Sequence, residues 1–118
     1  MPAERDGGLD AEDRKLVTLA RSTRARTGAA EGACVRDSDG RTYAAATVDL
    51  ASLRLSALQV AVAMAVSSGA RGLEAAAVLG ERDTATDADL AVVRDLAGPG
   101  IPVLVADPGG EMVQTLST

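Results

Sequence analysis

The residues that this chain lacks limit the chemistry it can perform. Its 118 residues include no histidine, one cysteine, Cys34, and one lysine, Lys15. Histidine is the commonest general base near neutral pH, so a Ser-His-Asp triad is excluded. Cys34 alone makes neither an internal disulfide nor a zinc-thiolate cluster, and we expect it to be a small buried residue on a strand in a reducing compartment. Lys15 is expected on an exposed helix face, so any reaction would depend on carboxylates and hydroxyls.

The carboxylates closest to a metal-site pattern are aspartates in predicted turns and loops, namely Asp37, Asp39, Asp83 and Asp87. Aspartate is favoured in turns because its side chain bonds to the nearby backbone, so a turn role explains these residues better than a hard-metal site. No pair of carboxylates stands at reaction spacing, and the glycines form no phosphate-binding pattern. We therefore expect no catalytic residue, no metal and no cofactor.

Two hydroxyl side chains stand at the predicted starts of helices. Ser56 precedes the apolar run ALQVAVAMAV, and Thr86 is followed three residues later by Asp89. A hydroxyl at the first position accepts a hydrogen bond from an N–H of the first helical turn, and an acidic residue there is favoured by the helix dipole. We interpret Ser56, Thr86 and Asp89 as capping residues. The alternative is a weak anion or hydroxyl-ligand pocket between two helix ends.

The elements that would position these residues follow an α/β pattern. An Asp-Gly turn between two extended runs predicts an antiparallel hairpin near the N-terminus. Residues 49–55 are predicted to be a loop, and residues 1–8 a disordered tail ahead of a single domain over 9–118. The predicted helices and strands are a helix from residue 10 to about 25, strands over 30–36 and 41–48, a helix over 56–69, a strand over 73–79, a helix over 86–97, and strands over 101–106 and 111–116. This alternation predicts a three-layer α/β/α sandwich with a mixed five-stranded sheet.

The composition argues against two classes of partner. The formal net charge is −5 at pH 7, whereas phosphate binding needs clustered Lys and Arg, so we expect no nucleic-acid partner. The N-terminal sequence MPAERDGGLD is polar, and the apolar run after Ser56 is shorter than the ~18 residues of a membrane span. We therefore expect a soluble, cytoplasmic protein that does not contact the membrane.

The order of elements and the local sequence resemble the small, homotetrameric-type cytidine deaminase family over roughly Asp13 to Glu111. The sequence DGR at 39–41 matches the family's hairpin turn, and the apolar residues after Ser56 match the helix that opens with Cys-Ala-Glu. The strand IPVLVAD and its glycine turn match as well. The resemblance implies a cytidine deaminase-like fold in which the helix over 56–69 lies at subunit contacts, and hence a homo-oligomer, either a dimer or a tetramer.

The residues that carry the family's chemistry differ in this chain. The motif Cys-Ala-Glu is replaced by SAL, and the motif Pro-Cys-Gly-Ala-Cys by ATDAD. The resemblance therefore places the three zinc thiolates at Ser56, Thr86 and Asp89, and the glutamate that moves protons at Leu58. Neutral hydroxyls are poor zinc ligands, and leucine cannot move a proton. We interpret these four residues as the positions of a lost active site.

Three functions are compatible with this pattern. The first is a catalytically inactive, zinc-free cytidine deaminase-like protein that acts as an oligomeric structural or interaction protein. The second is a module that binds a nucleoside or a related small molecule without turnover. In that case Thr47 and Asp49, which stand where the family's Asn-x-Glu holds the ribose, would accept hydrogen bonds from the ligand. The third, which we favour least, is an enzyme, either an active cytidine deaminase-type hydrolase or one whose different chemistry uses carboxylates and hydroxyls.

Overall fold

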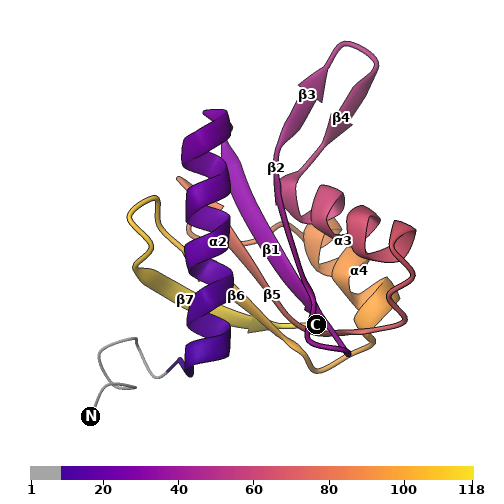
Figure 1. Ribbon diagram of the computed structural model, residues 1–118. Coiled ribbons are helices and arrows are strands. Elements are labelled where there is room, and N and C mark those ends of the chain that lie inside the picture. The colour runs from indigo at the N-terminus through magenta and orange to yellow at the C-terminus, as the bar shows by residue number, and fades with distance from the viewer. Residues whose placement is uncertain (1–8) are drawn as a thin grey trace.

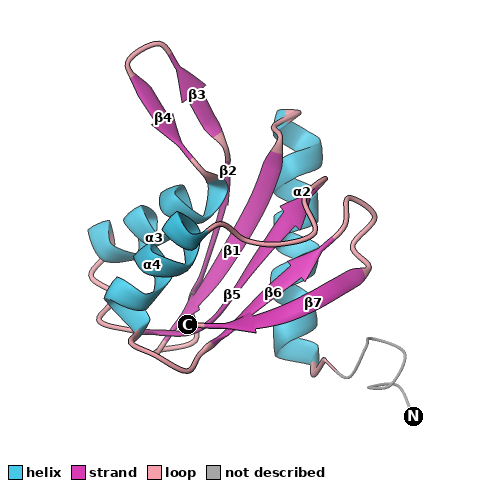
Figure 2. Ribbon diagram, turned by 180° about the vertical axis from the view of Figure 1, so that it is seen from behind, coloured by secondary structure: helices cyan, strands magenta, loops and turns pink. Residues whose placement is uncertain are grey.

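The protein has three layers, with a mixed sheet in the middle. The computed structural model describes residues 9–118, so the predicted tail over residues 1–8 lies outside the described residues. The sheet has the strand order β2-β1-β5-β6-β7. Helix α2 (Ala11–Thr27) covers one face, whereas α3 (Ala57–Ser67) and α4 (Asp87–Ala97) cover the other (Figures 1 and 2). The strands are β1 (Glu31–Asp37), β2 (Thr42–Ala46), β5 (Leu73–Gly80), β6 (Pro102–Ala106) and β7 (Met112–Ser117). The predicted three-layer α/β/α sandwich with a mixed five-stranded sheet is confirmed.

The directions of the strands agree with the predicted hairpin. Strands β1 and β2 are antiparallel, with Cys34 opposite Ala44 and Val35 opposite Tyr43. Their turn ends at Gly40, whose φ of 87° is a conformation that glycine adopts easily. Strands β5 and β6, which α4 connects, are parallel, whereas β1–β5 and β6–β7 are antiparallel. The parallel part is thus a single pair of strands in the described sheet.

One part of the secondary-structure prediction is wrong. Residues 49–55, predicted to be a loop, contain most of a second hairpin, formed by β3 (Val48–Leu50) and β4 (Leu53–Leu55). This hairpin stands out from the main sheet (Figures 1 and 2). Asp49 pairs with Arg54 across it, and their side chains form an ion pair with a nitrogen to oxygen distance of 3.4 Å. The two strands form because apolar and polar residues alternate in both VDL and LRL, a pattern that suits extended backbone.

One of two hydrophobic cores lies between α2 and the sheet. Leu16 and Ala20 of the helix pack against Cys34 on β1 and Leu104 on β6. Cys34 is fully buried, as predicted for a small residue on a strand. Burial raises the pKa of its thiol to about 11, so the thiolate that reacts or binds metal is disfavoured at neutral pH.

Helix α2 lies close to β1 because Gly32 has no side chain. A Cβ atom at Gly32 would overlap the carbonyl oxygen of Ala20 and would lie 3.0 Å from the Cβ of Arg24. The backbone of the helix therefore rests directly on the strand. This contact fixes the distance between two of the three layers.

The second hydrophobic core lies on the opposite face of the sheet, under α3 and α4. Leu58 of α3 and Val93 of α4 pack with Val35, Val78 and Val105, and all five side chains are buried. Successive side chains of a strand point to opposite faces of the sheet. The residues next to these three valines along their strands therefore face α2. Within residues 9–118, none of the helices combines the length and the apolar character that a membrane span needs.

Asp37, predicted to be a turn residue, is also a buried anchor. Its carboxylate accepts hydrogen bonds from the N–H groups of Asp39 and Arg41, both at 2.9 Å, and from the Tyr43 hydroxyl at 2.8 Å. Burial acts to raise the pKa of Asp37, but these three hydrogen bonds outweigh it and hold the pKa below its ordinary value. The hydroxyl of Tyr43 thus links β2 to the end of β1.

We expect Asp37→Asn to lower the free energy of unfolding at neutral pH, because the amide loses the charge that these donors stabilise. The folded-state pKa of Asp37 is depressed, so its contribution is full above the unfolded-state pKa and disappears as the pH falls through the folded-state pKa. The difference between wild type and variant should therefore shrink in urea denaturation series run at decreasing pH. Asp39→Asn, at an exposed position of the same turn, is the control. A difference that stays constant with pH would contradict the prediction.

Candidate functional site

The starts of α3 and α4 meet, and a short hydrogen bond joins them. The Ser56 hydroxyl donates to Asp89 Oδ1 at 2.6 Å. The N–H of Asp89 in turn donates to the Thr86 hydroxyl oxygen at 3.1 Å. The structure therefore brings together Ser56, Thr86 and Asp89, the three residues at which the resemblance places the family's zinc ligands.

The capping roles predicted for Ser56 and Thr86 are confirmed. Ser56 Oγ accepts a hydrogen bond from the N–H of Gln59 at 3.1 Å, and the Gln59 side chain accepts one from the N–H of Ser56 at 2.8 Å. This reciprocal arrangement is a complete capping box. The Ser56 hydroxyl thus donates to Asp89 and accepts from Gln59, and both of its roles are used within the protein.

These residues do not suit the zinc ion that the fold implies. Structural and catalytic zinc sites use thiolate, imidazole and carboxylate ligands. Here two of the three candidate donors are neutral hydroxyls that cap helices, and the Asp89 carboxylate already accepts a hydrogen bond from the Ser56 hydroxyl. In the part of the chain that the structure describes, no three His, Cys, Asp or Glu side chains are grouped so that they could hold a metal ion.

Leu58, where the resemblance places the family's glutamate, belongs to the hydrophobic core. Its side chain is fully buried between α3 and the sheet. It packs with the apolar residues of the core between the sheet and the helices α3 and α4. It offers no group that could move a proton.

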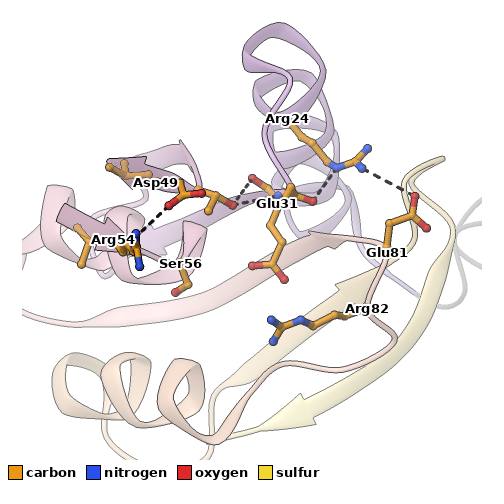
Figure 3. A pocket seen from close by; sticks show the side chains of 11 residues that line it. Arg24, Glu31, Asp49, Arg54, Ser56, Glu81 and Arg82 are labelled. Atoms are coloured by element: carbon orange, nitrogen blue, oxygen red, sulfur yellow. Dashed lines mark hydrogen bonds and ion pairs between the residues drawn. The ribbon is translucent and has the colours of Figure 1, made fainter. Parts of the chain in front are cut away.

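A pocket of about 420 Å³ lies beside Ser56 (Figure 3). Thr47 and Asp49, the predicted ligand-binding residues, both line it. The charged residues around it are balanced, with Arg24, Arg54 and Arg82 facing Glu31, Asp49 and Glu81. The structure therefore brings Thr47 and Asp49 into one pocket with Ser56, whereas Thr86, Asp89 and Leu58 are not part of its lining.

The polar atoms of Thr47 and Asp49 already have partners. The Thr47 hydroxyl accepts from the N–H of Glu31 at 3.0 Å and donates to its carbonyl oxygen at 3.3 Å. Asp49 is exposed and forms the ion pair with Arg54. A ligand would have to share these atoms with the groups that hold them now, so a ligand-binding role for the two residues stays a prediction.

Glu31 and Arg82 are among the residues of this pocket that were not singled out from the sequence. Glu31 begins β1 and Arg82 follows β5, and both side chains extend into the pocket (Figure 3). Burial raises the pKa of the Glu31 carboxyl above its ordinary value, the nearby Asp89 acts in the same direction, and Arg82 opposes them. Glu31 and Arg82 are distant in the sequence. They come close because β1 pairs with β5 in the antiparallel direction, which places Glu31 opposite Gly80.

A second, apolar hollow of about 460 Å³ lies between α3 and α4. Its lining includes Val62 and Val66 of α3 and Val92 and Leu96 of α4. Val66 is 54% exposed, and α3 carries no charged residue anywhere along its length. This surface is unusual for a helix that faces water, since exposed helix faces are normally polar.

Comparisons with known proteins agree with this architecture. The structure is similar to crystal structures of cytidine deaminases from three bacteria. The enzyme of Burkholderia pseudomallei has 23% identity and a TM-score of 0.78, over 92% of this chain and 93% of that chain. The enzyme of Mycobacterium leprae has 19% identity and a TM-score of 0.72, over 92% and 94% of the two chains. The enzyme of Bacillus anthracis has 13% identity and a TM-score of 0.65, over 92% and 84%. At these identities, the likeness concerns the fold.

The sequence itself provides the evidence for family membership. A search against curated protein sequences gives no significant match. The family model described as "Cytidine deaminase-like", in contrast, matches residues 9–110, which is most of the chain. With both the predicted family and the predicted fold supported, the chain belongs to the cytidine deaminase-like family.

Proposed function

We propose that this protein is a zinc-free member of its family that does not deaminate cytidine and that acts as an oligomeric structural or interaction protein. The observation that carries the proposal is the 2.6 Å hydrogen bond between Ser56 and Asp89. It joins two positions where the resemblance places zinc ligands. At these positions the Ser56 hydroxyl and the Asp89 carboxylate therefore bind each other.

The chemistry of deamination supports this proposal. In zinc deaminases, three ligands hold a metal that activates a water molecule, and a glutamate transfers protons to and from the ring. Here Leu58 cannot transfer a proton, and the hydroxyls of Ser56 and Thr86 are used in capping. A cytoplasmic location belongs to the same proposal and is supported by the buried, unpaired Cys34, which is typical of a reducing compartment.

Zinc content and cytidine turnover test the first part of the proposal. The protein is purified from zinc-supplemented cells, its metal content is measured by atomic absorption, and cytidine turnover is followed by ultraviolet absorbance. We expect far less than one zinc per chain and no deamination above the uncatalysed rate. A zinc-loaded cytidine deaminase is the positive control. One zinc per chain, or measurable turnover, would overturn the proposal.

The exposed face of α3 supports the oligomeric part. Met64 and Val66 are 39% and 54% exposed, and no charge along α3 would repel a second copy. In a symmetric dimer the same patch of each subunit meets its equivalent, so an uncharged apolar helix is self-complementary. We therefore propose that α3, with the hollow between α3 and α4, packs against a second copy of the chain.

We expect Val66→Glu to convert the oligomer to monomers, because each subunit would bring a carboxylate into the apolar contact. Size-exclusion chromatography with light scattering measures the mass. Val113→Glu is the matched control, since Val113 is an exposed valine on β7, away from α3. The proposed contact would be wrong if wild type is a monomer, or if both variants change the mass equally.

A second candidate function is a module that binds a small molecule without converting it. It is supported by the pocket that Thr47, Asp49 and Ser56 share. A ligand that binds the folded state raises the melting temperature, so a thermal-shift panel that includes nucleosides tests this candidate. The absence of any shift at millimolar concentrations would contradict it.

A further inference from the structure

The pocket beside Ser56 contains two opposite charges that the protein leaves without direct partners. Among residues 9–118, the carboxylate of Glu31 and the guanidinium of Arg82 form neither a side-chain hydrogen bond nor an ion pair. The other arginines of the pocket are held in place. Arg24 donates to the Ala30 carbonyl at 3.0 Å, and Arg54 is paired with Asp49.

The positions of Glu31 and Arg82 suit a ligand placed between them. The two side chains come from different strand ends and extend toward each other in the pocket (Figure 3). Glu31 is only partly exposed, and burial of a charge without a partner costs free energy. The raised pKa of its carboxyl reflects that cost. A bound group with hydrogen-bond donors and positive charge would remove it.

The charges also limit the kind of ligand. An anion would be attracted to Arg82 but repelled by Glu31 and by Asp89, which is close enough to act on the charge of Glu31. A cation would be attracted to Glu31 but repelled by Arg82. A neutral nucleoside would leave Arg82 without an ionic partner. The pocket's charged residues cancel, three basic against three acidic, so a ligand without net charge matches the pocket as a whole.

We propose that this pocket binds a small zwitterion of the amino-acid type, with its ammonium group at Glu31 and its carboxylate at Arg82. Val48 and Leu55 also line the pocket and provide apolar contact for an aliphatic side chain. The inference rests on the second candidate function, that the pocket holds a small molecule. It does not depend on the absence of zinc or of turnover.

The test compares amino acids with analogues that lack one charge. L-Leucine, L-alanine and L-glutamine are titrated into the full-length protein by calorimetry and in thermal-shift assays, alongside N-acetyl-L-leucine, L-leucine methyl ester and cytidine. We expect at least one amino acid to bind and to raise the melting temperature. Removing either charge from leucine should weaken binding about tenfold or more, because hydrogen bonds to charged groups are worth more than neutral ones.

Two variants then assign each charge to its residue. Glu31→Gln should bind leucine about tenfold more weakly and should no longer distinguish leucine from its N-acetyl derivative. Arg82→Gln should likewise lose the distinction between leucine and its methyl ester. Arg71→Gln, at an exposed position outside the pocket, is the control and should bind as wild type does. A general loss of structure would weaken the binding of every ligand, whereas the loss of one specific contact removes only the discrimination at the ammonium group or only that at the carboxylate.

Three outcomes would overturn the inference. They are the absence of amino-acid binding at about 10 mM, equal binding of leucine and its blocked analogues, and binding of cytidine in preference to the amino acids. In the last case the second candidate function stands and only the ligand class is wrong. The zinc and turnover measurements give separate answers, so failure here leaves the first proposal intact.

Discussion

Replacing Leu58 by glutamate is expected to lower the free energy of unfolding by more than about 4 kcal/mol, or to prevent folding altogether. The Leu58 side chain is fully buried among residues of α3, α4 and the sheet. The substitution removes this packing and places a carboxylate among apolar side chains. Urea denaturation followed by circular dichroism measures the change. The prediction bears directly on the proposed function, because the resemblance places the family's catalytic glutamate at Leu58.

Two milder variants make the result interpretable. Leu58→Ala creates a cavity and should cost about 2 to 5 kcal/mol, whereas Leu58→Met keeps the volume and should cost less than about 1.5 kcal/mol. This order, with glutamate worst, is expected if position 58 is part of the core. If Leu58→Glu proves as stable as wild type, the side chain at this position reaches an accessible pocket, and the interpretation of a lost active site would be wrong.

The second large effect is expected at Gly32. Gly32→Ala should destabilise the protein by about 3 kcal/mol or more, because the new methyl group would overlap the backbone of α2 at Ala20. Relief requires the whole helix to move away from β1, which would also loosen the packing of Leu16 against Leu104. Thermal unfolding or urea denaturation measures the loss.

Two controls separate this clash from a general effect of glycine replacement. Gly109→Ala should change the stability by less than about 0.5 kcal/mol, since its Cβ would meet only Asp107 Oδ1, at an ordinary 3.4 Å. Adding Ala20→Gly to Gly32→Ala should not restore stability, because the obstructing atom is a carbonyl oxygen, which any residue at position 20 retains. Rescue by Ala20→Gly would show that side chains, and not the helix backbone, set the spacing.

Local signals were sufficient to predict most of the framework. Ser56, Thr86 and the Asp39-Gly40 turn each act through hydrogen bonds or backbone angles within a few residues, so their roles follow from neighbouring sequence. The two apolar strands β5 and β6 were recognisable as buried runs for the same reason. The β3–β4 hairpin was missed because its strands have three residues each, and a three-residue alternation is a weak signal.

The pocket could be predicted only in part, because its residues come from distant segments. Thr47, Asp49 and Ser56 were found through motif positions, and all three do line the pocket. Glu31 has no sequence feature that marks it, because its exposure to the pocket depends on β1 lying beside β5 and on the loop that carries Arg82. In the same way, the Ser56 to Asp89 hydrogen bond spans 33 residues and depends on how two helices pack.

The hydrogen bond between Ser56 and Asp89 also bears on whether a zinc site could be built at these positions by mutation. Two sulfur atoms on one tetrahedral zinc lie about 3.8 Å apart, since each Zn–S bond is about 2.3 Å, whereas these two oxygens are 2.6 Å apart. A single substitution of either residue by cysteine would break the present contact and still leave too few ligands for zinc. The first such substitution would thus remove a stabilising contact before a full set of ligands exists. The contact between Ser56 and Asp89 therefore opposes the stepwise assembly of a zinc site at these positions.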